Sequence, residues 1–229
     1  LSFYGRAIFT IANKYIINAS VRRDGSSRFF NGTKDYVWGN FPGVSLAWRL
    51  DQEGFLKGTG VNTLKLRGGW GKTGQQELPI SYGAFAKYSP SQIGAEYQFG
   101  IGENSYFTMY RPDVYNPYLT WETTTNKNLG LDFGFANNRI SGSVDVFRKD
   151  TEDLLVYSPI AAGDLSNFNW LNVGNIKNEG IEGVLNLVPV KNENTTWELS
   201  FNATHYKPIV TKLIENASNE LSTSHNSSE

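Results

Sequence analysis

The 229-residue sequence carries 21 basic and 22 acidic side chains, which gives a formal net charge of -1 at pH 7. This balance gives no support for nucleic-acid binding, which usually needs a basic surface. With 39% hydrophobic and 19% charged residues, the chain is not a disordered or collagen-like polymer. The absence of cysteine excludes disulfides and thiolate metal sites. No apolar run reaches the length of about 18 residues that a transmembrane helix requires.

Eight segments show the alternation of apolar and polar residues that is typical of β-strands. Most of them have about ten residues or more, whereas strands of soluble proteins have about five or six and membrane-crossing strands about nine to eleven. The lengths therefore favour the wall of a barrel. The segments are roughly 3–12, 15–24, 38–50, 63–73, 121–135, 139–149, 177–190 and 195–206.

The connections between these segments alternate in length. Tight connections at 13–14, 137–138 and 191–194, and an intermediate one at 51–62, alternate with long ones at 25–37, 74–120 and 150–176. Outer-membrane barrels have short periplasmic turns and long extracellular loops, so this alternation predicts an all-β antiparallel transmembrane barrel. A soluble β-sandwich stays open as the alternative. Within the intermediate connection, residues 51–58 predict one short helical turn.

The two faces of the predicted strands differ in polarity. In the stretch 129–135, four large apolar residues alternate with small or polar ones, among them Asp132. An arginine that faces lipid at the bilayer midplane costs about 2 to 4 kcal/mol. We therefore expect the mid-strand charges Arg67, Asp132 and Glu198 to face water or a partner inside a barrel. Four tryptophans are predicted on the apolar faces, where those near strand ends would form an interfacial girdle. They are Trp48, Trp70, Trp121 and Trp197.

Motifs for catalysis or cofactor binding are weak. Gly69, Gly71 and Gly74 satisfy the spacing G-x-G-x-x-G, but a dinucleotide site needs a helix immediately afterwards, and Pro79 interrupts one. Glycines that relieve crowding in a curved strand are the better interpretation. The two histidines are far apart, the acidic residues at 150–153 are typical of a solvated face, and no G-x-S-x-G elbow occurs. The sequence therefore predicts no enzyme, no cofactor and no metal site.

Aromatic residues crowd the long connection 74–120, which otherwise has the composition of a polar, irregular loop. Aromatic side chains present broad apolar faces with a polar tip, which suits stacking on a ligand or anchoring a protein partner. Packing of these rings on one another, to fold the loop down, is an equally good interpretation. The candidate residues for binding a substrate or partner are Tyr97, Phe99, Tyr106, Phe107 and Tyr110.

Five separate stretches resemble the SusC/RagA family of TonB-dependent outer-membrane transporters of the Bacteroidetes. The resemblance covers nearly all of residues 2–213, in order, and is absent from about the last dozen residues. The stretches are "GRAIFTIANKYIINASVRRDGSSRF" at 5–29, "FPGVSLAWRL" at 41–50 with "GFLK" at 54–57, "LKLRGGWGKTGQQE" at 64–77, "NPYLTWETTTNKNLGLDFGF" at 116–135 and "NVGNIKNEGIEGVLNL" at 172–187.

The resemblance implies a 22-stranded barrel in the outer membrane that imports glycans or peptides beneath a SusD-like lipoprotein lid and is driven by the TonB complex. It implies no catalytic residues. We expect residues 1–213 to supply about eight strands of the barrel wall, in contact with membrane lipid, and residues 214–229 to form a polar tail or loop. On this interpretation the sequence is a fragment without the plug, the TonB box and the closing strands. The alternative is a self-contained small β-barrel or β-sandwich binding module without transport activity.

Overall fold

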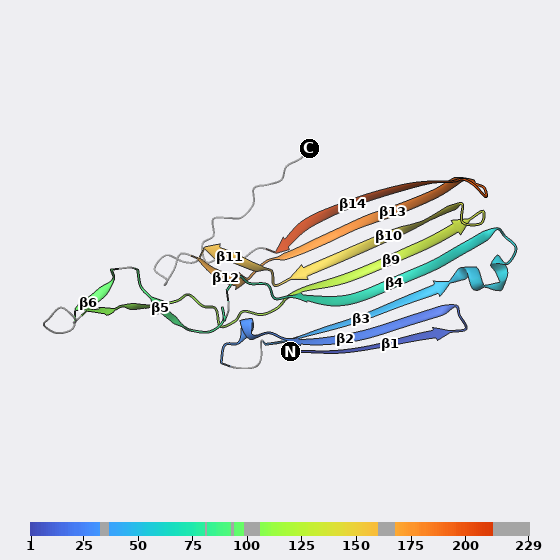
Figure 1. The fold of residues 1–229 in the computed structure, drawn as a ribbon. Helices are drawn as coiled ribbons and strands as arrows, with labels where there is room; N and C mark the ends of the chain where they lie inside the picture. Colours follow the sequence, from blue (N-terminus) through green and yellow to red (C-terminus); the bar gives the residue numbers. More distant parts are fainter. Residues whose placement is uncertain (33–36, 81, 93, 99–105, 160–167, 213–229) are drawn as a thin grey trace.

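The computed structural model describes residues 1–32, 37–80, 82–92, 94–98, 106–159 and 168–212 (Figure 1). Eight long strands form one antiparallel sheet in the order β1-β2-β3-β4-β9-β10-β13-β14. No helix in this part of the chain is long and apolar enough to cross a membrane. The long strands are β1 (Ser2–Ile11), β2 (Tyr15–Gly25), β3 (Trp38–Arg49), β4 (Val61–Gln75), β9 (Glu122–Phe135), β10 (Ile140–Glu152), β13 (Asn175–Lys191) and β14 (Thr196–Lys212).

The predicted all-β antiparallel architecture is confirmed, and each long strand coincides with one predicted segment. Each strand pairs with the next long strand in the chain, as in an up-and-down barrel wall. Among the described residues, β1 and β14 are bonded on one side only, so the sheet has two bare edges. The small closed eight-stranded barrel that we considered is therefore not formed. The tail expected at 214–229 lies outside the described residues.

The two ends of the sheet differ in the same way as the predicted connections do. Tight connections lie together at one end, the turn end, and the long connections lie at the other, the loop end (Figure 1). At the turn end, Asn13, Asn137 and Asn138 adopt φ values of 55°, 57° and 58°. Asparagine tolerates this left-handed conformation better than most residues, which explains its place in the tight turns. The predicted helical turn is present as two 3-10 turns, η2 (Leu50–Gln52) and η3 (Gly54–Leu56).

The strand register separates the residues of the sheet into an apolar face and a polar face. On the apolar face, Leu131 lies between Leu66 and Val144 of the neighbouring strands. Its neighbour Asp132 points to the polar face beside Lys65. No described residue covers these apolar side chains: Val144 is 43% exposed, and Leu129 on the same face is 53% exposed. One face of this sheet is therefore a continuous apolar surface.

Charged residues on the polar face form a compact cluster of ion pairs. The Arg67 guanidinium lies 2.7 Å from Asp132 on β9 and 3.0 Å from Asp145 on β10. The Lys65 ammonium lies 2.9 Å from Asp132. These mid-strand charges therefore face inward partners, as the sequence predicts. Glu198 lies exposed on the edge strand β14.

The long connections contain short strands of their own, which the sequence did not indicate. Residues 74–120, predicted to be irregular, hold two small antiparallel pairs, β5 with β8 and β6 with β7. A third pair, β11 with β12, lies in the next long connection. The bounds are β5 (Tyr88–Pro90), β6 (Glu96–Gln98), β7 (Tyr106–Thr108), β8 (Tyr110–Pro112), β11 (Leu155–Pro159) and β12 (Phe168–Asn172).

A hydrophobic core holds the loop end together, and we name it the loop cluster. Its buried members are Phe29, Phe41, Leu78, Ala84, Leu119 and Trp121. The ring of Trp121 packs edge-on against Phe41 at 5.2 Å and lies 5.4 Å from Phe29, and its indole N–H donates to the Val37 carbonyl at 3.2 Å. The prediction that Trp121 belongs to the exposed apolar face is therefore wrong. The residue precedes β9, where loop packing replaces the alternation of the strand.

At the turn end, one carboxylate joins three side chains. Glu53 accepts hydrogen bonds from the Lys14 ammonium at 2.7 Å, the Trp48 indole at 3.1 Å and the Tyr15 hydroxyl at 3.3 Å. The rings of Tyr15 and Trp48 stack at 6.1 Å. The hydrogen bond from Lys14, followed by that from Trp48, lowers the pKa of Glu53 below its ordinary value. This group fastens the connection after β3 to the turn between β1 and β2.

The lowered pKa of Glu53 predicts a loss of stability in acid. A carboxylate whose pKa is lower in the folded state stabilises the fold fully above its unfolded pKa, about 4.3 for Glu, and loses this effect as pH falls through the folded pKa. We expect the Glu53→Gln variant to have a lower thermal midpoint at neutral pH. Its thermal midpoint should also decrease less between about pH 5 and pH 3 than that of the unchanged protein. Circular dichroism in detergent measures both quantities.

The matched control is Glu193→Gln in the turn between β13 and β14, where the described residues provide no ion-pair partner. Its pH profile should coincide with that of the unchanged protein. Identical profiles for Glu53→Gln and Glu193→Gln would contradict a stabilising role for Glu53.

The loop cluster predicts a local effect of core truncation. Leu119 is 0% exposed, whereas its neighbour Tyr118 is 72% exposed. Leu119→Ala should destabilise the loop end by about 2 to 5 kcal/mol, because the truncation leaves a cavity. Trypsin cleavage after Lys87, in the same connection, should then become faster. Tyr118→Ala is the control and should leave the cleavage rate unchanged; equal rates for the two variants would count against the cluster as the support of this connection.

Candidate functional site

The two longest connections are joined by asparagine side chains at the loop end. The Asn116 amide donates to the Trp170 carbonyl at 3.1 Å, and the Asn169 amide donates to the Tyr115 carbonyl at 3.2 Å. Asn172 accepts from the Thr120 backbone N–H at 2.8 Å and donates to the carbonyl of the same residue at 2.9 Å. These bonds satisfy backbone groups of Tyr115, Thr120 and Trp170. They place β12 beside the segment that leads into β9.

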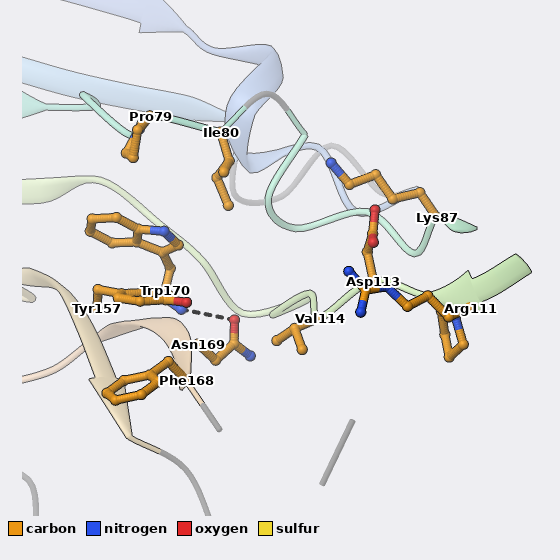
Figure 2. Close-up of a pocket in the computed structure, with 11 residues that line it drawn as sticks. Pro79, Ile80, Lys87, Arg111, Asp113, Val114, Tyr157, Phe168, Asn169 and Trp170 are labelled. Carbon is orange, nitrogen blue, oxygen red and sulfur yellow. Dashed lines mark hydrogen bonds between the residues drawn. The ribbon is translucent and has the colours of Figure 1, made fainter. Parts of the chain in front are cut away.

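A cavity of about 560 Å³ lies between these joined connections (Figure 2). One side is aromatic, because Tyr157 of β11 stacks on Phe168 at 5.3 Å and lies 5.4 Å from Trp170, both of β12. The other side carries Lys87, Arg111 and Asp113. The remaining lining residues are Pro79, Ile80, Pro112, Val114 and Asn169.

Local hydrogen bonds hold both sides of the cavity in place. The Asp113 backbone N–H donates to the Lys87 carbonyl at 2.9 Å, and the Ser89 hydroxyl bonds the Asp113 carboxylate at 2.5 Å. On the aromatic side, the Trp170 backbone N–H donates to the Asn169 side chain at 2.8 Å (Figure 2). The lining is therefore ordered by its own elements, although it comes from segments far apart in the sequence.

The chemistry of this cavity suits binding. Flat apolar rings on one side and charged groups on the other are the usual composition of a ligand pocket, in which apolar area contributes affinity and a few polar groups orient the ligand. Among the residues that the structure describes, no group of three His, Cys, Asp or Glu side chains is arranged to hold a metal ion. Gly69, Gly71 and Gly74 lie within β4, so the G-x-G-x-x-G spacing belongs to a strand. A Cβ on Gly74 would overlap the ring of Phe41, which accounts for that glycine by packing.

The aromatic candidates from the sequence lie away from this cavity, on an arm that we define as the described residues of 94–110. Tyr97 of β6 lies opposite Phe107 of β7, and the exposed fractions of these side chains are 60% and 59%. Tyr106 is 54% exposed and Tyr110 of β8 is 65% exposed. Phe99 lies outside the described residues. The arm projects beyond the loop end of the sheet (Figure 1).

The sequence did not single out the residues of the cavity. Tyr157, Phe168 and Trp170 belong to strands of five residues each, too short for a clear period, and Lys87, Arg111 and Asp113 belong to no recognisable motif. The only signal was aromatic enrichment, which also occurs in the arm and in the loop cluster. Spatial convergence of two connections is what distinguishes the cavity from the other aromatic groups.

A family model described as "TonB dependent receptor-like, beta-barrel" matches residues 1–224. The chain is 40% identical over 217 residues to the TonB-dependent receptor SusC of Bacteroides thetaiotaomicron, which covers 93% of this chain and 21% of the relative. It is 35% identical over 215 residues to the TonB-dependent receptor P39 of Formosa agariphila, which covers 93% of this chain and 20% of the relative. The chain therefore spans about a fifth of the length of these relatives.

Solved structures agree with these relatives. A structure of the RagAB peptide transporter superposes with a TM-score of 0.80 at 26% identity and covers 93% of this chain and 22% of the solved one. The siderophore receptor PirA of Pseudomonas aeruginosa, at 18% identity and a TM-score of 0.60, shares the fold. The resemblance to SusC/RagA proteins is thus confirmed, and the chain belongs to the TonB-dependent receptor β-barrel family of the bacterial outer membrane.

Proposed function

We propose that this sequence forms part of the wall and of the extracellular loops of a TonB-dependent importer of glycans or peptides. The observation that carries the proposal is an unclosed sheet with one exposed apolar face and all long connections at one end. The relation to SusC and to the RagAB peptide transporter supports import as the activity. Residues 1–213 are the barrel part of this proposal, and residues 214–229 are its polar tail or loop.

The wall has two tasks in this proposal. Its apolar face excludes water against lipid, while the polar face lines an aqueous interior through which the substrate passes. The cluster around Arg67 balances two carboxylates and two cations, so the interior carries no strong local charge at this level. The TonB complex supplies energy through parts of the transporter other than this wall, so the residues of the wall position the substrate and perform no chemistry on it.

The cavity at the loop end is the proposed substrate contact of this chain. A sugar ring or an aromatic or aliphatic peptide side chain fits against Tyr157 and Trp170, because flat rings contribute apolar area without much loss of conformational freedom. Arg111 and Asp113 lie opposite and offer charged hydrogen bonds that orient the polar groups of the same ligand. The arrangement suits glycans as well as peptides, so the binding measurement described below decides the class of substrate.

The arm is the proposed contact for the SusD-like lipoprotein lid. Its aromatic side chains are more than half exposed and stand apart from the sheet, as an anchor for a protein partner requires. Tyr97 and Phe107, which face one another across the β6–β7 pair, form the centre of this surface. If the aromatic rings of the arm packed on one another, their side chains would be covered. The side chains of the described aromatic residues are exposed instead.

The test separates the two surfaces with two variants of the complete membrane protein that carries this sequence. Replacing Tyr97, Tyr106, Phe107 and Tyr110 by Ser should remove most of the co-purifying lid lipoprotein, since loss of one aromatic hot spot often costs about 2 kcal/mol or more. Replacing Tyr157 and Arg111 by Ala should leave the lid bound and weaken substrate binding at least about tenfold, which corresponds to about 1.4 kcal/mol.

Calorimetry measures binding of the oligosaccharides and peptides on which the organism grows. The matched control is Tyr88→Ser, because Tyr88 is an exposed aromatic residue, at 71%, that belongs to neither surface. Normal lid binding by the arm variant would refute the arm as the lid contact. Unchanged binding of every tested substrate by the cavity variant would refute the cavity as a substrate contact.

A further inference from the structure

The apolar face ends at a regular boundary toward the loop end. Followed from the turn end, at least four successive residues on this face of every long strand carry no charge. On β9, for example, Phe135, Phe133, Leu131 and Leu129 are followed by Lys127. On six of the strands a charged residue follows next on this face. These residues are Arg23 on β2, Lys72 on β4, Lys127 on β9, Arg148 on β10, Glu179 on β13 and Lys207 on β14.

These residues are neighbours across the sheet. Lys127 lies opposite Arg148, Arg148 lies opposite Glu179, and Glu179 lies opposite Lys207. Lys127 also lies opposite Trp70 of β4, and Lys72 is the next residue of β4 on the same face. Five of the charged residues, from Lys72 to Lys207, therefore form one continuous belt on the outward surface, and Arg23 stands apart from them on β2; we name the whole set the basic belt.

The basic belt has an excess of positive charge. With Asp150 and Lys177, the next residues of β10 and β13 on this face, it contains six cations and two carboxylates, which leaves a surplus of four positive charges in a chain whose formal net charge is -1. Both carboxylates pair with Arg148, at 2.9 Å and 3.4 Å, and Lys177 pairs with Glu179 at 2.8 Å. Within the described residues, no carboxylate forms an ion pair with Lys72, Lys127 or Lys207.

The position of the basic belt corresponds to lipid headgroups. From Tyr15 to Arg23 a strand rises roughly 26 Å at about 3.3 Å per residue, which a barrel tilt of about 40° reduces to roughly 20 Å of height. Aromatic rings lie at the same level: Arg23 stands over the ring of Trp38 at 5.1 Å, and Trp38 stacks on Phe3 at 6.1 Å. Aromatic rings of this kind mark the interface between the hydrocarbon and the headgroups.

We propose that the basic belt binds the phosphate groups of anionic lipid in the outer leaflet. The geometry favours a lipid over a protein partner because the cations continue directly from the lipid-facing surface, so an acyl chain on the apolar face carries its headgroup to this level. Lys127 and Arg148 line a hollow of about 270 Å³ together with Thr125 and the carboxylates Asp150 and Glu152. Lysine and arginine both form charge-assisted hydrogen bonds to phosphate.

The experiment uses the complete membrane protein in a neutral detergent, with bisphosphorylated lipid A as the probe. Bound lipid is counted by native mass spectrometry and its affinity measured by titration at low and high salt. In the triple variant Lys72→Gln/Lys127→Gln/Lys207→Gln, affinity at low salt should fall about tenfold or more, because each lysine near an anionic lipid surface contributes roughly a factor of five. The same variant should lose most of the salt dependence.

Charge removal at the turn end is the matched control: Lys57→Gln/Arg139→Gln/Lys191→Gln changes the net charge equally and should leave the affinity unchanged. The heat-dependent gel shift of a folded barrel verifies that both variants fold. If the triple belt variant does not fold, the single variant Lys127→Gln replaces it. Equal affinity of the belt variant and the control would overturn the proposal. Equal binding of dephosphorylated lipid A, or displacement of lipid A by inorganic phosphate at the same concentration, would overturn it as well.

Discussion

The ion-pair cluster on the polar face fixes the alignment of the central strands, and the remaining structure depends on that alignment. Arg67 of β4 reaches Asp132 of β9 and Asp145 of β10, so one guanidinium spans three strands. A shift of one residue between β4 and β9 would turn a charged side chain toward the apolar face. At the bilayer midplane this costs about 2 to 4 kcal/mol for arginine. The alignment is thus specified by charge as well as by backbone hydrogen bonds, across the junction where the chain makes its longest excursion.

A single alignment determines the positions of the other functional surfaces. Because side chains alternate strictly, the alignment that sets Lys65 opposite Asp132 and brings Arg67 to the same carboxylate also places Leu131 on the lipid side and Lys127 at the level of the headgroups. It brings the ends of β4, β9 and β10 to one height, from which the two long connections start. Asn116 and Asn172 can then reach across the gap between these connections. The cavity is therefore a consequence of wall geometry together with a few side-chain bridges.

The wall could be predicted from the sequence because its physical rule is periodic. Strand limits, tight turns at Asn13 and Asn137, and the inward charges all follow from alternation and turn chemistry. The cavity and the loop cluster have no period. Trp121 illustrates the limit: it continues the pattern of β9, yet Phe29 and Phe41 from distant segments bury it. Contacts between irregular segments depend on the folded positions of both, which local pattern does not contain.

The bare edges of the sheet impose a requirement on its surroundings. In hydrocarbon an unpaired backbone N–H or C=O group costs several kcal/mol, and a long edge strand presents a row of them. The cost of two such rows exceeds the total stability of a typical domain, about 5 to 15 kcal/mol. Both β1 and β14 therefore need strand neighbours when the apolar face lies in lipid. A sheet with this apolar face and these edges is stable in a membrane only as a sector of a larger closed barrel, in keeping with the much greater length of its relatives.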